Sequence, residues 1–220
     1  MRFVLASRNA HKLAEYRAIL APHDVAPMPD GIELPPEGVT SFEANARAKA
    51  EALARALSRG AGRSAAPPAG AGSPAAVSPV VAPGAIVIAD DSGIEVAALG
   101  GAPGVISARY AGHEGDDVAN NARLLTELNA LPGEHDRAAR FVCVIAFVPD
   151  GAVAAQAVRG EWPGAIAAAP RGAAGFGYDP LFVPTGLSFA VAEMTESDKN
   201  AQSHRARAAR ALLARLAASA

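Results

Sequence analysis

Short apolar runs alternate with helix-like patterns along this chain of 220 residues. The unbroken apolar stretches at 86–89 and 141–148, and the segment 2–6 that is apolar after Arg2, are typical of buried strands, because a strand covered on both faces has no polar alternation. Residues 153–162 are expected to pair with 141–148 across the turn Pro149-Asp150-Gly151. The pattern therefore predicts a core of strands joined by helices and turns.

Apolar residues recur at helical spacing in the segments between these strands. Leu13, Tyr16 and Ile19 predict a first helix, which either Ser7 or Asn9 can cap. A second helix is expected over the alanine-rich run to residue 57, after a capping box formed by Thr40 and Glu43.

Two further helices are predicted in the second half of the chain. Asp116 and Asp117 cap a helix that ends near Pro132, and the last helix ends near residue 216. His204 and Arg205 fall in the first turn of that last helix, where the macrodipole disfavours cations. This mismatch indicates that the two side chains serve something other than helix stability.

Two segments carry little regular pattern. Residues 22–36 form a proline-rich connection with little helix signal. Residues 58–85 are mostly Ala, Gly, Pro and Ser with almost no charge, which predicts a flexible surface insertion within one domain spanning 1–220. An interdomain linker is the alternative.

Composition narrows the functional classes. Half of the chain is hydrophobic and 19% is charged, and the formal net charge is −2, so no overall basic field favours nucleic acid. We expect no membrane partner and a cytoplasmic location, because neither a signal peptide nor a bilayer-spanning apolar stretch is recognisable. The single cysteine, Cys143, lies in an apolar run and is expected to be a core residue.

The clearest candidate for chemistry is the pair Asp90 and Asp91, placed where the strand at 86–89 is expected to end. In open α/β sheets ligands bind beyond the carboxyl ends of strands. Neighbouring carboxylates there suit Mg²⁺, which takes oxygen ligands. Alone, Asp-Asp-Ser-Gly is equally typical of a polar turn.

Two loops offer weaker signals. The loop at 7–12 leads into a helix whose free N–H groups can bind an anion, with Lys12 adding charge, although a solvated lysine fits equally well. It lacks the glycines of a Walker A motif. The glycine-dense loop 172–180 carries two aromatic residues that can stack on a base or simply pack in the core.

Six stretches in a fixed order resemble the inosine/xanthosine triphosphate pyrophosphatases, which hydrolyse non-standard purine nucleoside triphosphates. They are SRNAHK (7–12), EGVTSFEANA (37–46), ADDSG (89–93), GGAPGVISARYAG (100–112), GFGYDPLF (175–182) and EMTESDKNAQSHR (193–205). The resemblance covers nearly the whole chain outside the insertion and is far more specific than any single motif.

The resemblance implies an α/β fold with an elongated, twisted mixed sheet, flanking helices, two lobes with a central cleft, and a homodimer. It assigns Glu37 and Asp91 as Mg²⁺ ligands and Asp91 as the general base. The substrate-binding residues that it implies are Ser7, Arg8, Asn9, Ala10, His11, Lys12, Ser92, Phe176, Gly177, Tyr178, Asp179, Lys199, His204 and Arg205. Lys12 is the main cation for the triphosphate, whereas Lys199, His204 and Arg205 recognise the keto edge of the purine.

The implied reaction is an in-line attack of water on the α-phosphorus, which releases a nucleoside monophosphate and pyrophosphate. Two features depart from the family's pattern: Gly38-Val39 follows Glu37 where bacterial members usually have Thr-Gly, and 58–85 replaces a shorter connection. The sequence leaves open whether Asp90 or Asp91 orients the water, and how ITP, dITP and XTP rank.

Three alternative functions differ from this one in features that the sequence or a simple assay can distinguish. A haloacid-dehalogenase-type phosphatase spaces its aspartates by one residue, whereas Asp90 and Asp91 are adjacent. A pyrophosphatase for modified pyrimidines would differ in its base contacts, which a comparison of substrates would reveal. A non-catalytic nucleotide-binding module would not need the proposed base at Asp91.

Overall fold

One mixed β-sheet runs the length of the molecule. The computed structural model describes residues 1–61, 84–133, 136–152 and 154–219, and within them six strands follow the order β2-β1-β3-β4-β5-β6. The strands are β1 (Arg2–Leu5), β2 (Asp24–Pro27), β3 (Ile86–Val96), β4 (Ala138–Val148), β5 (Gln156–Ile166) and β6 (Phe182–Pro184). β1 is parallel to both β2 and β3, whereas β3, β4, β5 and β6 pair antiparallel in turn. The expected elongated mixed α/β sheet is confirmed.

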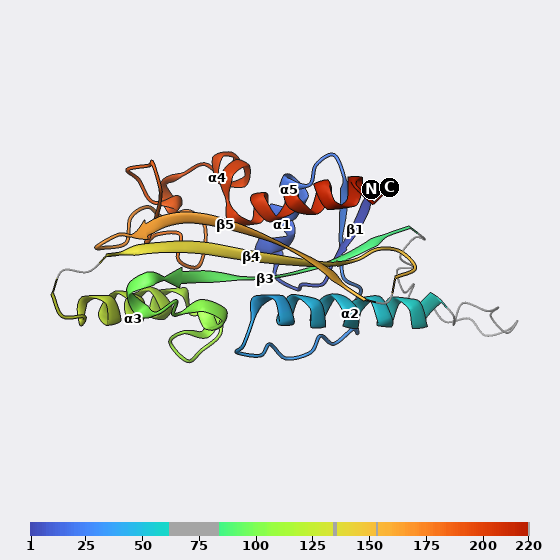
Figure 1. Ribbon diagram of the computed structural model, residues 1–220, viewed down its shortest axis with the longest axis horizontal. Helices are drawn as coiled ribbons and strands as arrows, with labels where there is room; N and C mark the ends of the chain where they lie inside the picture. Colours follow the sequence, from blue (N-terminus) through green and yellow to red (C-terminus); the bar gives the residue numbers. More distant parts are fainter. Residues whose placement is uncertain (62–83, 134–135, 153, 220) are drawn as a thin grey trace, which may run out of the picture.

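Helices cover both faces of this sheet, as Figure 1 shows with the sheet nearly edge-on. α1 (Ala10–Ile19), α4 (Glu196–Gln202) and α5 (His204–Ala217) lie on one face. α2 (Phe42–Ala61) and α3 (Asp117–Asn129) lie on the other. Three short 3₁₀ helices complete the described elements: η1 (Ala97–Leu99), η2 (Gly104–Arg109) and η3 (Val191–Glu193).

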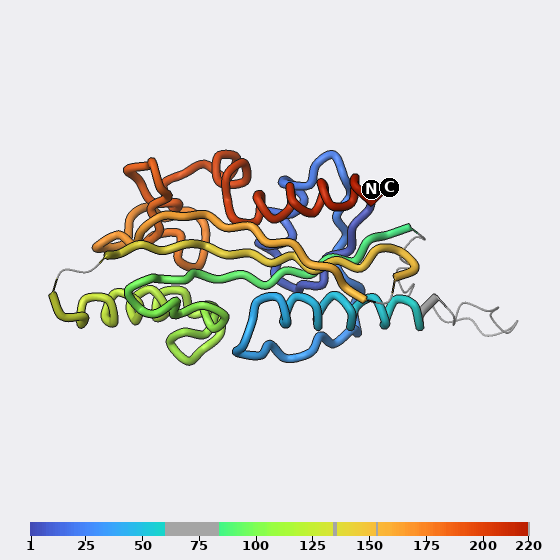
Figure 2. Tube along the Cα trace, viewed as in Figure 1, coloured from blue at the N-terminus to red at the C-terminus, as the bar shows by residue number. Residues whose placement is uncertain are grey.

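The strands β3, β4 and β5 are long enough to join two lobes (Figure 2). At one end, α2 packs on the sheet through a core that includes Phe42 and Leu53, while Tyr16 of α1 and Leu212 of α5 pack on the opposite face. At the other end, a separate core forms around α3, η1, η2 and the far halves of the strands. Each lobe thus has its own apolar packing, which leaves polar groups free to gather between them.

The expectation that Asp90 and Asp91 follow the end of a strand is wrong. Both residues lie inside β3, which continues to Val96 because β4 pairs with it from Val87 to Val96. β1 pairs only with the first part of β3, from Ile86 to Ile88. The tertiary pairing therefore overrides the turn-forming tendency of Asp-Asp-Ser-Gly.

Several helix predictions hold, with changes at their ends. Asn9 caps α1, Asp116 caps α3, and α5 begins at His204 as expected. The predicted Thr40 cap is wrong, because α2 begins at Phe42 and the Ser41 hydroxyl accepts from the Ala44 N–H at 3.2 Å.

Other differences concern segments with weak patterns. α2 continues to residue 61, so the first four residues of the expected insertion are helical, and residues 62–83 lie outside the described residues. β2 lies in the proline-rich connection, where no strand was predicted. β5 begins at Gln156 rather than at residue 153, which also lies outside the described residues. Within the described part of the chain, no helix has the length and apolar character needed to cross a membrane.

Candidate active site

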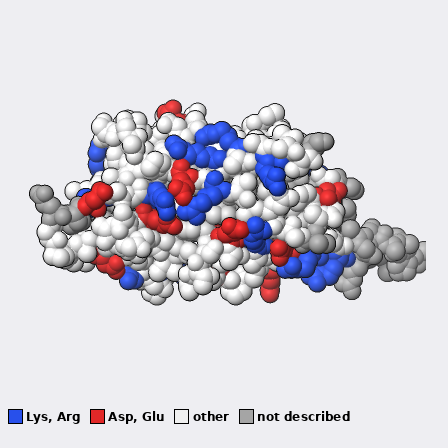
Figure 3. All heavy atoms as spheres, viewed as in Figure 1, with Lys and Arg blue, Asp and Glu red and all other residues white. Residues whose placement is uncertain are grey.

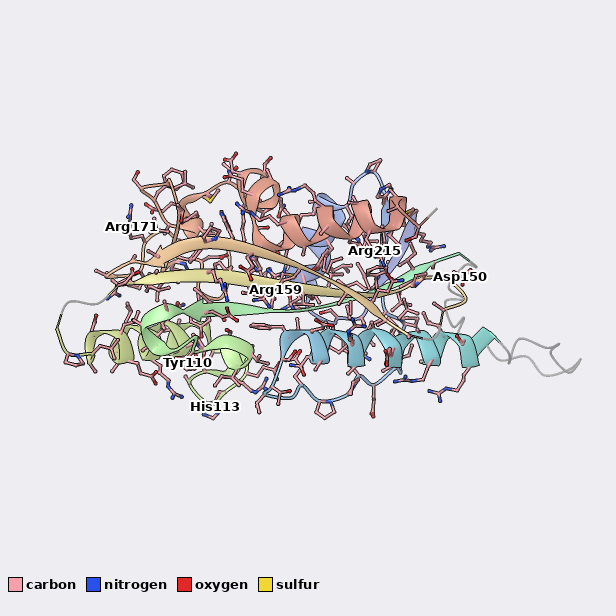
Figure 4. The ribbon with its side chains drawn as sticks, in the orientation of Figure 1. Tyr110, His113, Asp150, Arg159, Arg171 and Arg215 are labelled. Carbon is pink, nitrogen blue, oxygen red and sulfur yellow. The ribbon has the colours of Figure 1, made fainter. Side chains whose placement is uncertain are left out.

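Charges on the outer surface are mixed rather than segregated. On the face shown in Figure 3, basic and acidic side chains lie next to one another along the middle of the molecule. Arg159 of β5 (labelled in Figure 4) exemplifies this, because its Nε lies 2.6 Å from an Oε1 of Glu161. On this face the charges largely alternate, so we turn to a cleft for a concentration of charge that could bind phosphate.

Such a cleft opens where β1 ends beside β3. The Ala6 N–H donates to the Ile88 carbonyl at 2.7 Å, and beyond this point the chain leaves the sheet toward α1. The cleft has a volume of about 840 Å³. The residues singled out from the sequence that line it are Ser7, Arg8, Asn9, His11, Lys12, Glu37, Asp91, Ser92, Phe176, Gly177, Tyr178, Asp179, His204 and Arg205.

The loop before α1 presents backbone donors at one wall of the cleft. The Asn9 side chain accepts from the Lys12 N–H at 3.1 Å, and the Asn9 N–H donates to the Ser7 hydroxyl at 3.2 Å. Arg8 instead faces the loop that covers the cleft, where it donates to the Ile32 carbonyl at 2.9 Å. Ala10 is helical and does not line the cleft, so its contribution is limited to its backbone.

Asp90 and Asp91 point to different partners because neighbouring positions on a strand face opposite sides. Asp90 is 1% exposed and accepts from the Lys12 ammonium at 3.0 Å. Burial alone would raise the pKa of Asp90, but Lys12, Arg205 and Lys49 together hold it below its ordinary value. Asp90 is therefore an ionised anchor for cations.

Asp91 forms no ion pair with any cation among the described residues, and it lies near another acid, Glu37. Its carboxylate accepts from the Asn45 amide at 2.8 Å and from the Ser92 N–H at 3.0 Å. Burial, with the nearby charge of Glu37, raises the pKa of Asp91 to about 6. A carboxylate that gains a proton this readily is suited to accept one at neutral pH.

Glu37 also lines the cleft, near Asp91, and is held by two cations. Its Oε1 lies 2.7 Å from the Lys49 Nζ and its Oε2 lies 3.6 Å from an Arg109 nitrogen. Burial would raise the pKa of Glu37, yet Lys49, Lys12 and Arg109 lower it overall. The side chain is therefore a carboxylate in the cleft.

Buried ion pairs form a continuous series, here called the ion-pair chain. It runs from Lys12, in the first turn of α1, to Asp179 beside Phe176. Arg205 lies 3.5 Å from Asp90 and 3.0 Å from Glu15, and Glu15 lies 2.9 Å from Lys199. The full order is Lys12, Asp90, Arg205, Glu15, Lys199 and Asp179.

At the aromatic end, Phe176 faces both cations that were expected to read a base. The Lys199 Nζ lies 4.5 Å from the centre of its ring and the Arg205 Cζ lies 5.3 Å from it. The His11 ring stacks on the same residue, with the ring centres 5.6 Å apart. Aromatic and cationic groups therefore converge at one place, which suits a planar, electron-rich base.

The loop carrying Phe176 is fixed by α3. The Gly177 N–H donates to Asp117 at 2.6 Å, and its carbonyl accepts from Asn121 at 2.8 Å. Tyr178 turns its hydroxyl to the Ser107 carbonyl at 2.9 Å, so its polar atom is used within the protein. His204 is buried and its ring stacks on Phe141, with the ring centres 4.7 Å apart.

Four residues of this site were not singled out from the sequence: Glu15, Asn45, Lys49 and Arg109. A signal existed for three of them, since Glu15 follows Lys12 by three positions and Lys49 follows Asn45 by four, which places each pair on one helix face. Their burial, with Lys49 at 7% and Asn45 at 6% exposed, depends on tertiary packing.

Known proteins resemble this chain in sequence and in fold. The profile described as "Ham1 family" matches residues 3–215. The "dITP/XTP pyrophosphatase" of Nocardia farcinica is 46% identical over 99% of this chain and 95% of its own length. The "dITP/XTP pyrophosphatase" of Ralstonia nicotianae is 44% identical over 98% of this chain and 96% of its own length.

Solved structures agree with these sequence relatives. The Staphylococcus aureus Ham1 protein superimposes with a TM-score of 0.76 at 34% identity, over 100% of both chains. A "Nucleoside-triphosphatase / dITP/XTP pyrophosphatase" from Mycobacterium abscessus gives a TM-score of 0.63 at 39% identity, over 97% of this chain and 99% of the other.

Proposed function

This chain belongs to the Ham1 family, and from that premise we infer that it hydrolyses non-standard purine nucleoside triphosphates, dITP/ITP and XTP, to the monophosphate and pyrophosphate. It is a nucleoside triphosphate pyrophosphatase, a hydrolase of phosphoanhydride bonds that cleanses the nucleotide pool. The ion-pair chain is the observation that supports placing this function in the cleft. It connects Lys12, which we assign to the phosphates, with Lys199 beside Phe176, which we assign to the base. One nucleotide can then be held at both ends.

The triphosphate binds at the start of α1. Free N–H groups of the first helical turn and the ammonium of Lys12 supply positive potential at one point of the cleft. The Lys12 side chain lines the cleft and is 17% exposed, so it is not fully enclosed by its contact with Asp90. Ser7 and Asn9 shape the loop that presents these donors.

Hydrolysis of nucleoside triphosphates generally uses a divalent cation, which neutralises charge on the phosphate oxygens. We assign Mg²⁺ here, with Glu37 and Asp91 as its protein ligands. These residues fit, because Mg²⁺ is usually held by one or two carboxylates and completed by water and substrate phosphates. The described residues hold no cluster of three or more acidic, His or Cys ligands, which agrees with such a shared site.

Asp91 is the group that accepts a proton from the attacking water. Asp90 is committed to cations, whereas Asp91 contacts only neutral donors and its pKa of about 6 lies near neutrality. A water oriented by Asp91 attacks the α-phosphorus in line, and pyrophosphate leaves. Lys12 and the α1 N–H groups stabilise the charge that develops on the phosphates.

The base binds at Phe176. Its ring provides a stacking surface, and we assign recognition of a keto oxygen to Lys199 and Arg205, whose cationic groups lie over that ring. Arg205 lines the cleft directly, whereas Lys199 lies behind it in contact with Asp179. Adenine carries an amino group at the same edge. This group is a donor, so it cannot accept a hydrogen bond from Lys199 or Arg205. This complementarity explains why a keto purine is the expected substrate.

The function is tested by pyrophosphate release from dITP beside dATP, with and without Mg²⁺. We expect release from dITP that depends on Mg²⁺ and exceeds release from dATP. Equal rates on both substrates would contradict the proposed base recognition. A preference for a modified pyrimidine triphosphate would instead favour the neighbouring class of pyrophosphatases.

The role of Asp91 is tested by Asp91→Asn, which keeps the shape and removes the charge. Loss of a general base typically lowers the rate by about 10²–10⁴-fold, and weaker metal binding would add to this. The control is Asp24→Asn, the same substitution at a carboxylate whose side chain is 65% exposed. Near-normal turnover by a folded Asp91→Asn protein would show that another group accepts the proton.

Two further properties stay proposals. We propose a homodimer, on the family resemblance, and light scattering at several concentrations would measure it. We also propose action in the cytoplasm without nucleic-acid partners. The formal charge of −2 and the mixed charges on the face shown in Figure 3 support the absence of nucleic-acid partners, because an overall basic field is what favours a polyanion.

A further inference from the structure

Asn45 has an unusual set of contacts for a residue inside an alanine-rich helix. It lies in the first turns of α2, its exposed fraction is 6%, and its side chain makes three hydrogen bonds. One amide hydrogen goes to Asp91 Oδ2 at 2.8 Å and the other to the Gly38 carbonyl at 3.2 Å. Its carbonyl oxygen accepts from the Gly38 N–H at 2.8 Å.

These contacts join the segment that carries Glu37 to the strand that carries Asp91. Gly38 follows Glu37 directly in the chain, and Asp91 lies in β3. Asn45 therefore hydrogen-bonds to the Gly38 peptide next to Glu37 and to the carboxylate of Asp91. Lys49 also links Glu37 to β3, because its ammonium donates to Glu37 Oε1 and to the Asp90 backbone carbonyl, both at 2.7 Å. Asn45 differs from Lys49 in contacting the Asp91 carboxylate itself.

Only an amide side chain satisfies all three partners. The Gly38 N–H needs an acceptor, whereas the Gly38 carbonyl and the ionised Asp91 need donors, and this pattern also fixes the orientation of the amide. A carboxylate at this position would lack the two donors, and an apolar side chain would lack both the donors and the acceptor. A lysine would donate to Asp91 but would add a positive charge that opposes a cation in the cleft.

We propose that Asn45 is a positioning residue that sets the separation and orientation of the Glu37 and Asp91 carboxylates for a divalent cation. The proposal rests on the function proposed above, since it assumes that both carboxylates serve that cation. Residues that hold metal ligands in place typically change metal affinity or activity by about 10–100-fold when they are removed. Because Asn45 is neutral, it orients both groups without reducing their negative charge.

The test compares Asn45→Ala and Asn45→Leu with wild type, the second variant keeping the volume of the side chain. Mn²⁺ binding is measured by electron paramagnetic resonance in the presence of pyrophosphate, and the Mg²⁺ concentration for half-maximal release from dITP is measured separately. We expect both quantities to shift about 10–100-fold toward weaker metal binding. The KM for dITP at saturating Mg²⁺ should change by less than about threefold, because the base contacts at Phe176 are untouched.

Asn120→Ala is the matched control. Asn120 is also buried and also braces a loop, accepting from the Ala111 N–H at 2.7 Å and donating to the Ala108 carbonyl at 3.2 Å. It should lower the melting temperature without weakening Mn²⁺ binding. A purely structural role for Asn45 would give the same result as this control.

Coupling to Asp91 gives a second measurement. In an Asp91→Asn background, Asn45→Ala should weaken Mn²⁺ binding by much less than it does alone, because the main group it orients is no longer charged. Mn²⁺ affinities in both Asn45 variants equal to that of wild type would overturn the proposal. A wild type that binds Mn²⁺ but releases no pyrophosphate would contradict the function instead, and the binding comparison would still decide the role of Asn45.

Discussion

Arg205 illustrates how each charged side chain in the cleft serves several partners at once. It is 4% exposed and contacts Glu15, Asp90 and the Ser92 hydroxyl, the last at 2.8 Å. Burial would lower the pKa of Arg205, but Glu15 and Asp90 raise it overall, so the guanidinium stays charged. Removing it entirely would leave Asp90 with Lys12 alone and Glu15 with Lys199 alone, which destabilises both buried carboxylates.

A conservative change separates selectivity from this structural duty. Arg205→Lys keeps the charge near Asp90 and loses the fork of donors that we assign to the keto edge of the base. We expect the ratio of kcat/KM for dITP to kcat/KM for dATP to fall by about tenfold or more, within the up to about 10⁴-fold that unpaired polar groups can supply. Steady-state kinetics on both substrates measure this ratio.

Arg215→Lys makes the same substitution at an exposed position near the end of α5 (Figure 4) and should leave the ratio unchanged. If Arg205→Lys lowers activity on dITP and dATP by the same factor, the guanidinium contributes to binding but does not select the base.

At the residue scale, the sequence identifies the charged residues that stand in the recognisable motifs, and it misses Glu15 and Lys49 further along α1 and α2. Lys12, Glu37 and Asp91 stand in the recognisable stretches and line one cleft. Glu15 and Lys49 look like ordinary polar positions on amphipathic helices, whose solvent-facing sides are expected to carry charge. Only the packing of α1 and α2 shows that these charges face inward and find partners there.

At the scale of elements, the position of α5 depends on one glycine of β5. A Cβ built at Gly160 would lie 2.3 Å from the Ala208 nitrogen and 2.4 Å from the His204 carbonyl oxygen. These are backbone atoms, which cannot move aside without moving the helix. The close approach of α5 to the sheet therefore places His204 and Arg205 at the cleft.

Gly160→Ala should push α5 away from β5 and affect both stability and catalysis. We expect a loss of about 1–3 kcal/mol in the free energy of unfolding, as in other overpacked interfaces, together with lower kcat/KM for dITP. Urea denaturation and steady-state kinetics measure the two effects.

Gly186→Ala is the control for that substitution. Its Cβ would meet nothing within 4 Å, but its φ of +86° makes a side chain unfavourable by about 1–2 kcal/mol. It should lose stability comparably and keep its activity. Full activity in Gly160→Ala would show that α5 tolerates the shift without disturbing its first turn.

Element predictions succeeded where the apolar pattern was long and failed where pairing decided the outcome. β4 and α3 were predicted from continuous apolar or periodic runs, with errors only at their ends. β3 continues through Asp90 to Gly93 because β4 supplies partners, which no local pattern reveals. β2 has four residues and ends at a proline, so its pairing with β1 leaves almost no sequence signal.

At the scale of the whole molecule, the buried charges make stability depend on pH. His204, the first residue of α5, is 3% exposed and packs on β4 through Phe141. The charged groups that affect it are those of Arg205, Lys199, Lys12 and Asp90. Burial lowers the pKa of His204 well below 6.5, and Arg205 and Lys199 lower it further, against the opposite influence of Asp90. The folded protein therefore keeps this imidazole neutral in mildly acidic solution.

The unfolded chain has no such environment, so its imidazole takes up a proton as the pH falls below about 6.5. The unfolded state then binds more protons than the folded state, and the stability contributed by the neutral His204 is lost as the pH falls. This contribution is complete above the unfolded pKa and decreases below it by up to about 1.4 kcal/mol per pH unit.

His204→Phe removes the titrating group and keeps an aromatic ring against Phe141. We expect the free energy of unfolding to depend less steeply on pH between about pH 5 and 6.5 than in wild type. Urea denaturation across this range measures the slope, and His113→Asn, at an exposed histidine (Figure 4), is the control that should leave it unchanged. An identical slope in His204→Phe and wild type would mean that the buried imidazole is protonated in the folded protein, with Asp90 outweighing both burial and the cations around it.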